Sequence, residues 1–359
     1  MEILRIIVFL IGAAIAARTV FSAVQTFVLP RSANDQLSRS VFRVMRGLFN
    51  VPLRKTTTYA QRDRIMAFFA PISLLTLIPV YLILILIGFA CMYWALGNVE
   101  TVEQALKVSG SSLLTLGYAA PADLPDGLLM FAEAAIGLFL VAILIAYLPT
   151  MYSAFQRRES AVTMLEVRAG SPPSAVEMIQ RYHRIHGLQR LSEVWSAWET
   201  WFADIEESHT SLAALVFFRS PQPDHSWVTA AGAVLDAAAF TRSTIDIPTD
   251  PQADLCIRAG YLALRRIADF FYVSYNANPK PGDPISISRD EFEAALDQLA
   301  TANVPLKADR DQAWRDFAGW RVNYDTALLA LASITMAPYA PWSSDRSLLP
   351  RRQIPRKTS

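Results

Sequence analysis

The chain has few charged side chains and only two cysteines. Charged residues make up 18% of its 359 residues, whereas hydrophobic residues make up 53% and the mean hydropathy is +0.26. Soluble domains carry roughly 25% charged residues, so the shortage of charge favours a membrane protein. Cys91 lies in an apolar run and Cys256 in a stretch with helical spacing, which excludes a disulfide framework.

Several functional motifs are also missing. The net charge of +1 gives no reason to expect nucleic acid as a partner. The glycine-rich turn of a nucleotide-binding domain is absent, and no alternating pattern predicts β-strands. We expect no catalytic residues and no cofactor. Glu206 and His209 are three residues apart, as are His183 and His186, so a shared metal site is an alternative, but solvated helical faces without a metal are favoured. An enzyme with its active site in residues 160–337 is the least favoured hypothesis.

Three long apolar runs are present instead. Residues 71–96 carry no charge and exceed the roughly 20 residues that cross a hydrocarbon core. Residues 127–153 are interrupted only by Glu133. Residues 3–29 include Arg18 near the middle, so three interpretations are open: a spanning helix, a signal sequence, or a helix packed beside the others. We expect the first.

The charges of the loops predict an orientation. Residues 31–64 contain eight arginines or lysines against two aspartates, whereas residues 97–126 contain four acidic residues and one lysine. Basic loops stay on the cytoplasmic side of a membrane. We therefore expect a multi-pass protein of the cell (inner) membrane, with the N-terminus outside and a cytoplasmic C-terminal domain.

The acidic loop between the second and third runs has its own pattern. Thr101 and Gln104 have the spacing of a capping box, and the apolar residues that follow predict a helix from about 102 to 114. The helix ends in residues 111–119, which become irregular, and Pro121 and Pro125 then lead to the third run. Irregular backbone inside a membrane is tolerated only where it is buried in protein or lines a watery cavity. The loop is therefore predicted to re-enter the membrane beside a pore.

At these residues the chain resembles the potassium channel family. A span, a pore helix, the filter Thr-Val-Gly-Tyr-Gly and an inner helix follow one another in the two-helix core of its bacterial members. The chain has Thr115-Leu116-Gly117-Tyr118-Ala119 at the filter position, and Gly137 where a gating hinge of the inner helix would lie. The resemblance spans residues 71–155. It implies a homotetramer that passes potassium or other monovalent cations through a filter lined by backbone carbonyls.

Three positions depart from the family's pattern. Ala119 replaces the second filter glycine, Leu116 replaces valine, and Ala120 stands where an aspartate usually follows. Alternate filter residues take left-handed backbone angles, which cost a residue with a Cβ atom about 1–2 kcal/mol, so Ala119 is expected to be strained. A weakly selective cation pore is a variant of the same hypothesis. The second hypothesis is a non-conducting membrane scaffold or sensor with a degenerate channel core.

Glu133 is the one carboxyl group deep in the inner helix. It is expected to support the pore, either by hydrogen-bonding behind the filter or by tuning the local field. The alternative is a carboxyl group near the outer end of the helix that contacts interfacial water.

The fold class predicted is an all-α membrane protein: a pore-loop channel core with an extra N-terminal span and an all-α cytoplasmic domain. Helix starts in that domain are expected at Ser174, Asp250, Ser288 and Asp309. Trp195, Trp198 and Trp201 form an aromatic stripe for which core packing is favoured over a ligand pocket. Whether this domain binds an unidentified ligand is left open. The predicted parts are an N-terminal membrane helix (1–29), a basic cytoplasmic or interfacial linker (30–70), the pore domain (71–155), the helical cytoplasmic domain (156–337) and a disordered tail (338–359).

Overall fold

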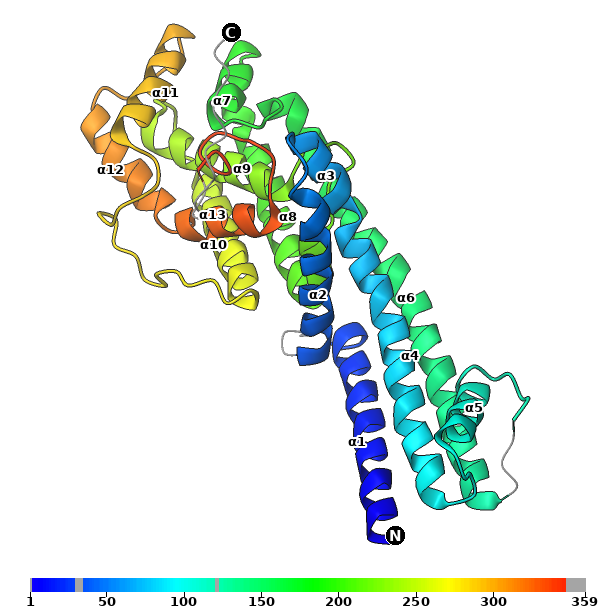
Figure 1. Cartoon of the computed structure of the whole chain (residues 1–359). Helices are drawn as coiled ribbons and strands as arrows, with labels where there is room; N and C mark the ends of the chain where they lie inside the picture. The colour runs from blue at the N-terminus through cyan, green and yellow to red at the C-terminus, as the bar shows by residue number, and fades with distance from the viewer. Residues whose placement is uncertain (1, 30–34, 120–122, 347–359) are drawn as a thin grey trace. The chain divides into compact units, whose positions relative to one another are not determined.

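The computed structural model describes residues 2–29, 35–119 and 123–346 (Figure 1). The structure is 75% helix, and the described residues contain no β-strand, which confirms the all-α class. The chain forms two compact units. The first unit contains the residues up to Ser153 together with Ser211–Phe218, and the second contains Ala154–Thr210 and the residues from Arg219 onward.

Three helices of the first unit are long and apolar enough to cross a membrane, as the three apolar runs predicted. They are α1, α4 and the first part of α6, which continues as one helix into the second unit. The elements of the first unit are α1 (Glu2–Phe27), α2 (Gln36–Leu53), α3 (Tyr59–Ala67), α4 (Phe69–Leu96), α5 (Val102–Leu113), the beginning of α6 (Leu124–Ala169) and the short 3₁₀ helix η3 (Ala213–Phe217).

Helices α1 and α4 pack side by side along most of α1 (Figure 1). Two glycines meet at their crossing: a Cβ atom on Gly12 would lie 2.4 Å from the carbonyl oxygen of Gly88, and a Cβ atom on Gly88 would lie 2.8 Å from that of Gly12. Small residues at such a crossing let two apolar helices gain van der Waals contact without a hydrophobic driving force between them.

A polar cluster explains how the first apolar helix accommodates Arg18. Its guanidinium lies 3.6 Å from the buried carboxylate of Asp35, which caps α2 by accepting the backbone N–H of Ser38 at 2.7 Å. The hydroxyl of Ser22 donates to the same carboxylate at 2.7 Å, and Ser38 Oγ lies 2.8 Å from the hydroxyl of Tyr81 on α4. Arg18 therefore has the charged partner that a cation in an apolar helix requires.

The second unit is built around α9 (Trp227–Thr244), which is buried along nearly its whole length and contacts α7, α10, α12 and α13. The four predicted helix starts are confirmed, because Ser174, Asp250, Ser288 and Asp309 each accept a backbone N–H of the helix that follows. The other elements are the end of α6 from Ala154, α7 (Ala175–Arg184), η2 (Leu188–Arg190), α8 (Leu191–Ser211), α10 (Pro251–Phe270), α11 (Arg289–Thr301), α12 (Arg310–Arg321) and α13 (Asp325–Thr335).

Residues 338–346 pack onto the second unit. Ala340 is 1% exposed, the Trp342 ring contacts the ring of Phe317, and Arg346 donates to the carboxylate of Glu291 at 2.7 Å. The predicted disordered tail is therefore wrong for residues 338–346, because its Pro- and Arg-rich composition does not reveal that these side chains have partners in the core. Residues 347–359 of that prediction lie outside the described residues.

A buried ion network lies at the centre of the second unit. The guanidinium of Arg321 is fully buried and donates to both oxygens of Asp236, at 2.6 and 2.8 Å, and to Asp325 at 2.7 Å. The hydroxyl of Tyr324 donates to Asp236 at 2.8 Å. These bonds join α9 to α12 and α13, and each buried charge has partners in good geometry, as a buried pair must.

Replacing Arg321 by methionine should lower the free energy of unfolding by about 3–5 kcal/mol, because Asp236 would stay buried without its cation. Arg315→Met on the same helix is the matched control: Arg315 is exposed and its hydrogen bonds go to the exposed Gln312, so a change within about 0.5 kcal/mol is expected. Urea unfolding followed by far-UV circular dichroism measures both. Equal losses in the two variants would show that the network does not stabilise this unit.

Candidate functional site

The short helix α5 begins where the sequence predicted. Thr101 Oγ1 accepts the backbone N–H of Gln104 at 3.2 Å, and the Gln104 side chain accepts the backbone N–H of Thr101 at 3.3 Å, which completes the capping box. The helix ends at Leu113 and buries one face. Two serines of that face, Ser109 and Ser112, are three residues apart and so lie on the same side of the helix.

The C-terminal part of α5 contacts both α4 and α6. The hydroxyl of Ser109 donates to the carbonyl oxygen of Leu86 in α4 at 3.0 Å. A Cβ atom on Gly137 of α6 would lie 2.4 Å from the carbonyl oxygen of Leu113. At 1.5 Å per residue, Leu86 lies about 15 Å from the end of α4 and Gly137 about 20 Å from the start of α6. Both contacts therefore lie well inside the apolar stretches of the two helices.

Glu133 joins all three helices of this site. Its side chain is fully buried; one carboxyl oxygen accepts the hydroxyl of Ser109 at 2.5 Å and the other accepts the hydroxyl of Tyr93 of α4 at 3.1 Å. The alternative in which Glu133 contacts interfacial water is therefore wrong. Sequence reasoning did not identify Ser109 and Tyr93 as its partners, although a serine on the buried face of a short helix is a signal for such a bond.

Helix α5 ends in a Schellman motif. The N–H of Leu116 donates to the carbonyl of Ser111 at 2.8 Å and that of Thr115 donates to Ser112 at 3.0 Å, which is a Schellman ending. Thr115 accordingly has a φ of +54°, and Gly117 has a φ of +71°. Nothing lies within 4 Å of a Cβ atom on Gly117, so this position favours glycine because of its backbone angle and not for lack of space.

Ala119 does not adopt a left-handed angle. The strain expected for it is therefore not present, and the alternation of backbone angles that begins at Thr115 ends at Gly117. The N–H of Ala119 instead donates to the hydroxyl of Ser111 at 3.1 Å, which holds the end of the segment against α5.

The carbonyl groups of residues 115–118 accept no hydrogen bond from the described part of the chain. Among the described residues, no donor bonds to the carbonyl oxygens of Thr115, Leu116, Gly117 or Tyr118, whereas the N–H groups of three of the residues from Thr115 to Ala119 bond back to α5. The side chains of Leu116 and Tyr118 are 60% and 64% exposed in the single chain. Successive carbonyl oxygens without donors are groups that can replace the water around a cation.

Gly137 has a packing role in this structure. It lies inside the continuous helix α6, and its lack of a side chain lets the backbone at Leu113 come close. The hinge function expected from the resemblance stays a prediction.

His209 lies elsewhere than expected. It is fully buried beside Arg158, whose Nη1 lies 3.3 Å from its Nε2, so the prediction of a solvated face is wrong for this residue. Burial lowers the pKa of His209 well below its usual value, and the Arg158 charge lowers it further. Within the described ranges, no group of three or more His, Cys, Asp or Glu side chains is placed to hold a metal.

The tryptophan stripe is confirmed as core, because Trp195, Trp198 and Trp201 are 1%, 5% and 6% exposed. No family model, curated protein or solved structure matches the chain.

Replacing Glu133 by alanine should lower the free energy of unfolding by about 1–3 kcal/mol, because the hydroxyls of Ser109 and Tyr93 lose a buried acceptor. The thermal midpoint should fall accordingly. Glu103→Ala is the control: its only ion pair, with Lys107, is exposed, so a change below about 1 kcal/mol is expected. Thermal unfolding of the detergent-solubilised chain compares them. A midpoint unchanged by Glu133→Ala would contradict a supporting role.

Gly137→Ala should destabilise the chain by about 1–3 kcal/mol, because the added methyl group would overlap the Leu113 carbonyl. Gly127→Ala is matched in chemistry and helix, yet nothing lies within 4 Å of its added carbon atom. It should therefore leave stability unchanged or raise it by up to about 1 kcal/mol. The same unfolding assay measures the difference, and a Gly137→Ala protein as stable as Gly127→Ala would contradict the close contact.

Proposed function

We propose that the chain is the pore-forming subunit of a passive cation channel that resembles the potassium channels. Thr115, Leu116, Gly117, Tyr118 and Ala119 form its filter, and their backbone carbonyls coordinate the ions. The observation that carries the proposal is the row of carbonyl oxygens for which the described residues supply no donor. It lies at the end of a short helix that packs well inside the apolar stretches of α4 and α6.

Energetics favour an ion path over a lipid-facing loop. An unpaired peptide group in hydrocarbon costs several kcal/mol, so consecutive free carbonyls at this depth require a cavity that contains water or ions. The C-terminal end of α5 adds the negative end of its helix dipole, which favours a cation. Glu133, Ser109 and Tyr93 hold α5 to both neighbouring helices, so the loop keeps its geometry as ions pass.

A homotetramer in the lipid bilayer follows from the same loop. One segment cannot enclose an axis, and closed symmetry supplies the remaining walls. The exposed side chains of Leu116 and Tyr118 would then be covered by neighbouring copies. The exposed apolar residues of α6, such as Phe131 and Leu138, would face those copies or lipid.

The loop charges favour the cell (inner) membrane with the second unit in the cytoplasm. Potassium is the expected main permeant ion. Leu116 and Ala119 make a weakly selective cation pore the nearest variant.

The second candidate function is a non-conducting membrane scaffold or sensor. It is favoured by one observation: the left-handed angles stop at Gly117, so Ala119 does not continue the carbonyl row in the way a glycine could. Ala119→Gly separates the two functions. A closed scaffold should gain conductance from the substitution, whereas a working pore should change mainly its preference among cations.

Purified full-length chain in liposomes should pass potassium or rubidium but not a large organic cation. Gly117→Ala should reduce this flux by about tenfold or more, because a left-handed angle costs alanine about 1–2 kcal/mol in each of four subunits. Gly47→Ala on α2, where nothing lies within 4 Å of the added carbon atom, is the control and should leave flux unchanged.

Two outcomes would sink the channel assignment. The first is a chain that is monomeric in detergent and in lipid. The second is a tetramer without cation flux over a wide range of voltage, pH and calcium concentration. If the flux through Gly117→Ala equals that through the unchanged chain, residues other than 115–119 form the filter.

A further inference from the structure

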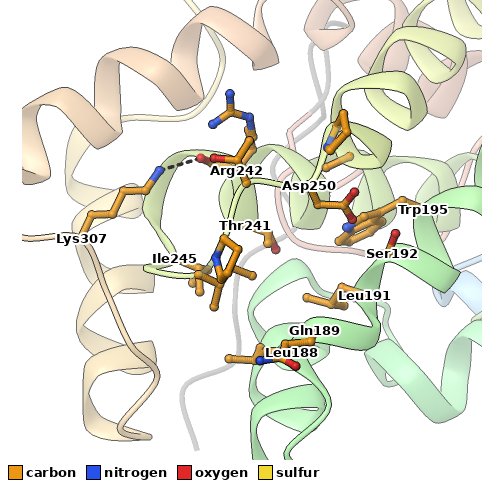
Figure 2. Close-up of a pocket in the computed structure, with 15 residues that line it drawn as sticks. Leu188, Gln189, Leu191, Ser192, Trp195, Thr241, Arg242, Ile245, Asp250 and Lys307 are labelled. Carbon is orange, nitrogen blue, oxygen red and sulfur yellow. Dashed lines mark hydrogen bonds between the residues drawn. The ribbon is translucent and has the colours of Figure 1, made fainter.

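A cavity of about 420 Å³ lies within the second unit (Figure 2). The start of α8, the end of α9, the segment that follows α9 and the start of α10 form its walls, and Lys307 lies at one side. This volume falls in the range of roughly 300–1,000 Å³ that small-molecule sites occupy. The cavity has no part in the proposed ion path.

The walls of the cavity are mostly apolar. Trp195 and Ile245 are each 1% exposed, and Leu191 is 2% exposed, so their positions are fixed by the packing around them. Trp195 belongs to the aromatic stripe of α8 and is the member of it that also lines the cavity. Rigid aromatic and aliphatic walls of this kind suit a flat apolar molecule.

Lys307 gives the cavity a cation with spare hydrogen-bonding capacity. Its ammonium donates to the carbonyl oxygen of Arg242 at 2.8 Å, and no carboxylate of the described residues lies within 4 Å of it. Arg242 differs, because its guanidinium pairs with Asp254 at 3.0 Å. An ammonium group has three N–H donors, so Lys307 keeps donors for an anionic group in the cavity.

Thr241 supplies a second, independent polar feature. The residue is 6% exposed and lines the cavity, and within the described residues its buried hydroxyl oxygen has no hydrogen-bond partner. A buried hydroxyl group without a partner costs about 1–3 kcal/mol. The carboxylate of Asp250, also at the cavity, is already engaged as the cap of α10, where it accepts the N–H of Gln252 at 2.9 Å.

We propose that this cavity binds a small molecule with a flat apolar body and a carboxylate group. The apolar body lies against Leu188 and Ile247, the partly exposed apolar residues of the wall, and the carboxylate accepts from the ammonium of Lys307. The site depends on the second unit alone, so it stands whether or not the loop after α5 conducts ions.

Naphthalene-2-carboxylate tests the site, with the uncharged naphthalene-2-carboxamide as matched probe. Binding of each to the full-length chain in lipid nanodiscs is measured by calorimetry, and empty nanodiscs give the partition background. Ser192→Trp fills the cavity, and Thr249→Trp narrows it from an exposed position if the first variant does not fold. Lys307→Gln removes the cation, and Lys280→Gln, at an exposed lysine outside the cavity, is its control. Circular dichroism establishes that each variant is folded.

The carboxylate should bind saturably to the unchanged chain and to Lys280→Gln with the same affinity. It should lose about tenfold or more in affinity in the cavity-filling variant, and about tenfold in Lys307→Gln, which corresponds to about 1.4 kcal/mol. The affinity of the carboxamide should also fall in the cavity-filling variant, but it should change less than about twofold in Lys307→Gln. Absence of saturable binding, or binding that neither tryptophan variant reduces, would overturn the site. An equal loss for both probes in Lys307→Gln would overturn the carboxylate assignment.

Discussion

The hydrogen bonds of Glu133 are the interaction on which the first unit depends. A short helix with several polar residues has little apolar surface with which to pack between two apolar helices. Helix α5 instead buries Ser109 against the carboxyl group of Glu133 in α6, which also accepts the phenol hydroxyl of Tyr93 in α4. Because all three groups are removed from water, each bond costs more to break than it would at a surface. These hydrogen bonds therefore also fix the position of the carbonyl groups that follow Leu113.

The second unit uses a different solution to the same problem of buried polar groups. Its central helix carries Asp236 on a face otherwise composed of small and apolar residues. Nη1 of Arg321 donates to both oxygens of that carboxylate, while Nε of the same guanidinium donates to Asp325. Such a pair adds geometric specificity, because the planar guanidinium fits a carboxylate in few orientations. It thereby sets the register in which α12 and α13 dock on α9, which apolar contacts alone would leave less defined.

Sequence patterns predicted what depends on local chemistry. The capping residues of α5, α7, α10, α11 and α12 and the three apolar helices could be located because caps and hydropathy act over a few residues. Contacts between distant residues could not be located. The pairing of Arg18 with Asp35, the burial of His209 beside Arg158 and the packing of Trp342 all depend on which helices become neighbours, and no short-range pattern encodes this. The same reason hid the partners of Glu133, although its own unusual position was evident.

The contact of Gly12 with Gly88 has a consequence for the fate of the N-terminal helix. Where two backbones touch, no acyl chain of a lipid or detergent can be inserted between them, so solvent molecules cannot separate α1 from α4 by wedging at that point. The polar cluster around Asp35 joins the same two helices nearer the C-terminus of α1, where the hydroxyl of Ser22 contacts that of Tyr81. Helix α1 should therefore stay packed against α4 when detergent replaces the lipid around the apolar helices.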